Sequence, residues 1–192
     1  MTHTLITALW YLGRGTGVSA LVLLTLSVCL GIVTRSGRRL PGLPRFALTD
    51  LHKTAALTAT GLLAVHIGTL LFDPYAQLRL ADVVLPFQGQ YRPIYLGLGT
   101  LAIDLVALVV ATSLLRHRIG PRAFKVVHWL TYLLWPLALL HGLGIGTDAP
   151  STWFTALSAA CVGLVAMIVA WRVTPAFGER GRVRVPREVA SR

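Results

Sequence analysis

Charged side chains are scarce in this chain, and acidic ones are the scarcest. Only 13% of its 192 residues are charged, with seven Asp and Glu against 18 Lys and Arg. An ordinary soluble domain carries charge on about 25% of its residues. Together with 55% hydrophobic residues and a mean hydropathy of +0.68, this scarcity excludes a typical soluble domain and indicates a polytopic membrane protein.

Cysteine is also nearly absent. Cys29 and Cys161 both lie inside apolar runs, so we expect small buried hydrophobic residues rather than a disulfide or a metal site. No basic segment precedes the first apolar run, which argues against a signal peptide. The chain is too short for a membrane bundle and a second soluble domain, so we expect one transmembrane domain over residues 1–192.

Five apolar segments follow one another, each long enough to cross a hydrocarbon core of about 30 Å. They are predicted at about 10–34, 51–72, 94–115, 123–143 and 151–173. The expected fold class is therefore an all-α membrane protein, a five-span transmembrane helical bundle. The glycine-rich segment 13–17 interrupts the first apolar run near its start. Prolines should keep 35–50 from being helical throughout, and 75–93 should be a longer loop with a short interfacial helix.

Basic residues lie mainly on one side of these spans. The linker with Lys53, the loop 116–125 and the segment from Arg172 hold five, four and six of the 18 Lys and Arg. The positive-inside rule then predicts the N-terminus outside and the C-terminus, with its basic tail 174–192, in the cytoplasm. We expect this basic face to reflect topology and anionic lipid, with docking of an acidic flavoprotein as the alternative.

Four histidines lie in the apolar spans at two similar spacings. His52 and His66 are fourteen residues apart, and His128 and His141 are thirteen apart. At the helical rise of 1.5 Å per residue, each pair is separated by ~20–21 Å along its axis. The second and fourth spans run in the same direction, so His52 should lie beside His128, and His66 beside His141. Intramembrane ionisable residues are functional candidates by default, and two stacked imidazole pairs are how a membrane bundle holds two b-type haems.

The thirteen-residue spacing is difficult for a straight helix. At about 100° per residue, fourteen residues return to within ~40° of the starting face, whereas thirteen miss it by ~140°. Pro136 lies between His128 and His141, and an internal proline kinks or rewinds a helix. Either this proline resets the phase, or two haems would lie against different flanks of the span.

Other polar residues in the spans allow more than one interpretation. Arg14 is expected to snorkel to the interface or to meet the propionates of an outer haem. Asp104, midway along the third span, is expected to be protonated or paired in a structural contact, with orienting a histidine or accepting a proton beside a quinone as alternatives. His117 should be solvated among headgroups. Four glycines are expected either to leave room for a porphyrin or to mediate helix packing: Gly13, Gly17, Gly61 and Gly68.

These features together resemble a known family. The similar segments are GRGTG at 13–17, Leu51-His52-Lys53 with the following His66, and FKVVHWLTY at 124–132 with the following His141. They resemble the ferric reductase-like transmembrane domain, the b-haem membrane module of ferric reductases, NADPH oxidases and the haem subunit of the bacterial periplasmic methionine sulfoxide reductase system. The resemblance covers about 10–171. It implies that His52, His66, His128 and His141 ligate haem iron, with electrons passing from an inner haem to an outer one.

Larger members of that family carry a further leading span and a C-terminal flavin and nicotinamide domain. Here nineteen residues follow the fifth span, without a glycine-rich dinucleotide fingerprint. We therefore expect an oxidoreductase-type electron-transfer subunit that lacks its own flavin domain and lies in a bacterial-type cytoplasmic membrane.

The expected partners follow from that interpretation. The donor would be a flavoprotein, a quinol, or a reduced flavin from a partner or bound at the cytoplasmic face, and the acceptor an extracytoplasmic redox partner. Lipid contact is expected, and nucleic acid is not. Two alternatives remain: a quinol-linked cytochrome b subunit of a periplasmic reductase, and a non-redox membrane scaffold or small transporter.

Overall fold

The computed structural model describes residues 3–36, 44–175 and 177, and these form helices and turns without a strand. The helices are α1 (His3–Ser36), α2 (Arg45–Phe72), α3 (Leu80–Val84), α4 (Pro93–Leu114), α5 (Arg116–Trp129), α6 (Thr131–Ile145) and α7 (Thr152–Val173). Five stretches of the described chain are long and apolar enough to cross a membrane: His3–Ser36, Phe46–Phe72, Pro93–Leu114, Arg116–Ile145 and Thr152–Val173. The predicted all-α bundle with five spans is confirmed.

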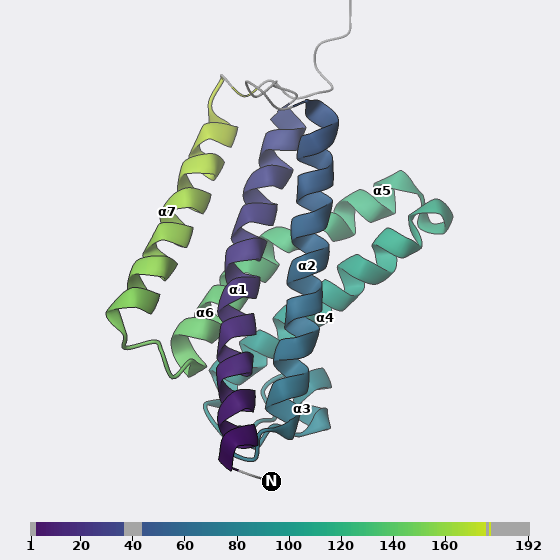
Figure 1. Cartoon of the computed structure of the whole chain (residues 1–192). Coiled ribbons are helices and arrows are strands. Elements are labelled where there is room, and N and C mark those ends of the chain that lie inside the picture. Colours follow the sequence, from purple (N-terminus) through teal and green to yellow (C-terminus); the bar gives the residue numbers. More distant parts are fainter. Residues whose placement is uncertain (1–2, 37–43, 176, 178–192) are drawn as a thin grey trace, which may run out of the picture.

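Helix α1 is the centre of the bundle. It packs along α2 and also contacts α6 and α7, and a larger share of it is buried than of any other span. In Figure 1, α1, α2 and α7 run side by side while α4, α5 and α6 cross behind them. Most buried residues of α1 are small or hydroxylated: Gly13, Thr16, Ala20, Thr25, Ser27, Cys29 and Ser36. Such residues let neighbouring backbones approach closely within a membrane.

The first two helices are longer than predicted. Helix α1 continues without interruption through the glycine-rich segment 13–17. Helix α2 begins at Arg45, directly after Pro44, so the last part of the predicted linker 35–50 is helical. The middle of that linker, 37–43, and nearly all of the basic tail lie outside the described residues.

The connection between α2 and α4 begins with an aspartate–proline turn. Helix α2 ends before Asp73 because the residue preceding Pro74 is disfavoured in the helical region. The Asp73 carboxylate then accepts the backbone N–H of Tyr75 at 2.9 Å, as short polar side chains do at turns. The short helix expected in this loop is confirmed as α3, and Pro93 occupies the first turn of α4, where its missing N–H costs nothing.

The fourth span consists of two helices. The turn after α4 is completed at Gly120, whose φ of 79° and ψ of 163° break the helical path. A second interruption at Leu130 separates α5 from α6. The N–H of Leu130 bonds to the carbonyl of Val127 at 3.0 Å, and the N–H of Leu133 bonds to that of Leu130 at 2.9 Å. Such three-residue turns rotate by ~120° per residue, which moves the phase between the two histidines in the required direction. At a gain of ~20° per residue over an α-helix, this turn supplies only part of the ~140° shift, and Pro136 lies inside α6.

A buried cluster joins α1 to α6 and α7. Its members are Leu21, Trp135, Leu139 and Cys161. The indole N–H of Trp135 donates to the hydroxyl of Thr25 at 2.9 Å, with both groups buried. Cys29 and Cys161 are buried free thiols, which confirms their predicted role as small hydrophobic residues.

Replacing Trp135 with Phe tests this cluster. The substitution removes the indole donor and part of the ring, while the Thr25 hydroxyl keeps its bond to the Leu21 carbonyl. We expect the free energy of unfolding in detergent to fall by about 1–3 kcal/mol. Trp129→Phe, at a half-exposed position, is the matched control and should have little effect. Equal losses in both variants would contradict this role.

Candidate functional site

The two histidines of α2 contact α1 in the same way. The Nδ1 atom of His66 lies 2.7 Å from the carbonyl oxygen of Gly13, and that of His52 lies 2.9 Å from the carbonyl oxygen of Ser27. The acceptors are fourteen residues apart, as are the histidines. A carbonyl oxygen can only accept a hydrogen bond, so each Nδ1 carries the hydrogen and each Nε2 keeps its lone pair. That tautomer can ligate a metal through Nε2.

A glycine four residues after each acceptor makes room for the ring. A Cβ atom on Gly17 would lie 3.0 Å from Cε1 and Nδ1 of His66. A Cβ atom on Gly31 would lie 3.3 Å from Cε1 of His52. Both distances are shorter than ordinary van der Waals contact, so these glycines allow the imidazoles to reach the α1 backbone.

His141 on α6 uses the same arrangement against α4. Its Nδ1 atom lies 2.9 Å from the carbonyl oxygen of Tyr95, and Gly99 follows that acceptor by four residues. A Cβ atom on Gly99 would lie 2.4 Å from the same Nδ1. Three imidazoles are thus held by the same arrangement, in which Nδ1 bonds to a helix carbonyl and a glycine one turn later makes room for the ring.

Sequence reasoning identified only part of this glycine set. Gly13 and Gly17 do face α2, whereas a Cβ atom on Gly61 or Gly68 would meet nothing within 4 Å. Gly31 and Gly99 were missed. The signal for Gly31 was available in the sequence, because Gly17 and Gly31 repeat the fourteen-residue spacing of the α2 histidines.

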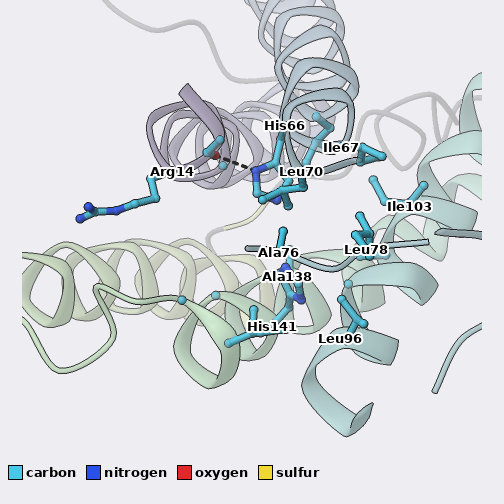
Figure 2. A pocket seen from close by; sticks show the side chains of 18 of the residues that line it. Arg14, His66, Ile67, Leu70, Ala76, Leu78, Leu96, Ile103, Ala138 and His141 are labelled. Atoms are coloured by element: carbon cyan, nitrogen blue, oxygen red, sulfur yellow. Dashed lines mark hydrogen bonds between the residues drawn. The ribbon is translucent and has the colours of Figure 1, made fainter. Parts of the chain in front are cut away.

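The histidines come together in the pairs expected from the topology. The ring centres of His52 and His128 are 6.2 Å apart, with an interplanar angle of 82°. His66 and His141 line one cavity of about 600 Å³, and Figure 2 shows their rings entering it from opposite sides. The bundle therefore contains two levels of paired imidazoles, the His52–His128 level and the His66–His141 level.

The ring separation in the His52–His128 pair fits a haem iron. Imidazole–metal bonds are about 2 Å long, and with roughly 1 Å from each ring centre to its nitrogen, two axial imidazoles have centres roughly 6 Å apart. The rings of His52 and His128 match this separation. Among the described residues, no three His, Cys, Asp or Glu side chains are grouped to hold a bare metal ion. Axial haem ligation needs only two imidazoles, because the porphyrin supplies the other ligands.

Arg14 lies at the edge of the cavity but its charge is already paired. Its Nε donates to Oδ2 of Asp148 at 2.6 Å, and its Nη2 donates to Oδ1. The guanidinium also lies 3.9 Å from the ring centre of Trp10. In Figure 2 the Arg14 side chain extends away from the two histidines. Asp148 is a site residue that sequence reasoning missed, since it lies 134 positions from its partner.

The other ionisable residues of interest lie outside the two levels. Asp104 is exposed on α4 and forms no hydrogen bond or ion pair with any described residue. The structural contact expected for it is absent among these residues, and the hydroxyls of Thr100 and Ser113 on the same helix donate to backbone carbonyls instead. His117 is exposed, as expected for a headgroup position.

Residues 16–139 match the model of the ferric reductase like transmembrane component. The chain belongs to this family. Three of the four paired histidines lie inside the matched range, and His141 follows two residues after its end. No curated protein and no solved structure gives a match. Membership agrees with a membrane electron-transfer module of a family that usually binds haem.

Replacing Gly99 with Ala tests the glycine arrangement in this ferric reductase-like chain. The new Cβ would overlap the His141 ring, so the imidazole has to move and lose its bond to Tyr95. We expect the free energy of unfolding to fall by about 1–3 kcal/mol. Gly61→Ala is the matched control in α2, where open space should make the change neutral or stabilising by up to ~1 kcal/mol. Stabilisation by Gly99→Ala would refute the assignment.

A second prediction concerns pH and the α3 loop. The Asp82 carboxylate is buried and accepts hydrogen bonds from the Arg79 guanidinium, and this bonding holds the pKa of Asp82 below its ordinary value of 3.8. A depressed native pKa stabilises the fold above pH 3.8, and this contribution is lost as the pH falls through the native value. Thermal unfolding in detergent should therefore become easier in that acid range. Arg79→Gln should flatten the dependence, and an unchanged slope would contradict this coupling.

Proposed function

We propose that this protein is a transmembrane b-type cytochrome that carries electrons across the bilayer through two haems. One observation carries the proposal: imidazoles from different helices come together in two pairs at two levels of the helical bundle. The fourteen-residue spacing on α2 separates the levels by ~21 Å. This separation would place the two haems one above the other, near opposite edges of the hydrocarbon core.

The residues of the chain would hold and tune the two groups. His52 and His128 would ligate one iron, and His66 and His141 the other. Haem supplies a reversible one-electron Fe(II)/Fe(III) couple when it is bound. The Nδ1 bonds to Gly13, Ser27 and Tyr95 fix the ring orientations and raise the basicity of the ligating nitrogens. Axial ligand basicity and burial in apolar surroundings are the means by which a protein sets haem potentials.

The distribution of charge supports a direction for the electrons. The basic linker and loop lie at the His52–His128 end of the sequence pattern, and the positive-inside rule assigns that end to the cytoplasm. A basic surface attracts an acidic flavoprotein or an anionic reduced flavin, and a membrane quinol is the remaining donor class. Electrons would leave from the His66–His141 level to an extracytoplasmic redox partner. The whole chain would act as one domain in a bacterial-type cytoplasmic membrane.

Haem binding is tested by spectroscopy of the purified full chain. Reduced-minus-oxidised spectra should show b-type bands, and haem extraction should give about two haems per chain. His66→Leu or His141→Leu should each lower the content to about one, as should His52→Leu or His128→Leu at the other level. The haem that remains in the His66 and His141 variants should differ in midpoint potential from the haem that remains in the His52 and His128 variants.

His117→Leu is the matched control, since it removes an exposed histidine outside both levels. Its haem content should equal that of the parent chain. A colourless parent preparation would exclude the cytochrome and favour the non-redox alternative. Equal losses in all five variants would show that histidine removal acts through folding and would overturn the two-site assignment.

A further inference from the structure

One of the four paired imidazoles is not fixed by a hydrogen bond. The Nδ1 atom of His128 is buried and has no hydrogen-bond partner among the described residues. The other three histidines each donate from Nδ1 to a carbonyl on the facing helix. The two levels are therefore built differently, with both rings tied at the His66–His141 level and only one at the His52–His128 level.

The sequence of α4 differs at the positions that correspond to His141 and to His128. Helices α4 and α5–α6 fold back on each other around Gly120, and Gly99 and His141 lie at equal distances in sequence from that turn. The positions equally far from it opposite His128 are Thr112 and its neighbour Ser113, with no glycine between Gly99 and Gly120. The hydroxyls of this pair donate to the carbonyls of Leu108 and Val109. This stretch of α4 thus lacks a glycine like Gly99, beside which His141 packs.

An aromatic ring contacts His128 instead. The side chain of Phe124 lies four residues earlier on α5, a spacing that places both on one face of the helix. The ring centres are 5.4 Å apart and the interplanar angle is 27°, which is an offset stack of the kind that aromatic side chains favour. This stack restricts rotation of the imidazole about its side-chain bonds.

We propose that Phe124 is a positioning residue that sets the plane of the His128 imidazole at the His52–His128 level. The inference rests on the proposed haem ligation and adds a role for a residue that would not touch the iron. Without an Nδ1 bond, His128 lacks the increase in basicity that the other ligands gain. The orientation of its ring, and with it the donation to the iron, would then depend on packing against Phe124.

The experiment measures the two haems separately. Phe124→Leu in the full chain should shift the midpoint potential of one haem upward and broaden its low-spin electron paramagnetic resonance signal, because a rotating imidazole donates less to ferric iron. The second haem should be unchanged. Phe124→Met, which also lacks an aromatic ring, should give the same shift, and Phe124→Tyr, which keeps the ring, should give parental values.

Two backgrounds identify the affected level. With His66→Leu, only the His52–His128 haem should remain, and Phe124→Leu should still shift it. With His52→Leu, the remaining haem should not respond. Trp129→Leu, beside His128 in sequence and half exposed, is the matched control and should leave both potentials unchanged.

The outcomes separate this inference from the function on which it rests. A parent chain without haem overturns both. A parent chain with two haems whose potentials and spectra ignore Phe124→Leu overturns only the role of Phe124. A shift of both haems, or an equal shift in Trp129→Leu, shows general loosening of the bundle and also overturns it.

Discussion

The hydrogen bond from a histidine Nδ1 to a helix carbonyl is the interaction on which the rest of this structure depends. In hydrocarbon an unsatisfied polar group costs several kcal/mol, so the carbonyl partners of His52, His66 and His141 stabilise these imidazoles inside the spans. A helix carbonyl already accepts one backbone bond but keeps a second lone pair. Gly17, Gly31 and Gly99 give access to such carbonyls, since any larger residue would occupy the space of the imidazole.

This requirement also fixes how α1 and α2 pack. The contact of His66 with Gly13 and that of His52 with Ser27 are related by the same fourteen-residue step on two antiparallel helices. A slide of one residue would break both bonds and press both rings against side chains. The register is therefore set at two points ~21 Å apart, which accounts for the long contact between these helices in Figure 1.

The sequence predicted the spans and the pairing of histidines but not the way in which they are held. Spans follow from local hydropathy, and pairing follows from span direction, so both can be read along the chain. The carbonyls that accept the histidine hydrogen bonds cannot be predicted in this way. Tyr95 and His141, for example, come into contact only because two separate helices pack in one particular register. The uninterrupted helix through 13–17 depends on contacts of the same kind. Gly13 and Gly17 face α2, and close helix packing there offsets their low helix propensity.

Packing between helices also determines which groups pair with the charged side chains at the end of the bundle that contains α3. Three basic residues lie at this end. Arg14 bonds to Asp148, Arg79 to Asp82, and Arg92 to the carbonyl of Gly144. These bonds join α1 to the loop after α6, and the start of α4 to the end of α6. Asp73 is buried at the same end, so three carboxylates offset the three cations and this end presents little net charge beside the cavity of His66 and His141. The other basic residues of the described chain lie at the end of α1, in the first half of α2, in α5 and at the end of α7, an asymmetry of the kind that the positive-inside rule describes.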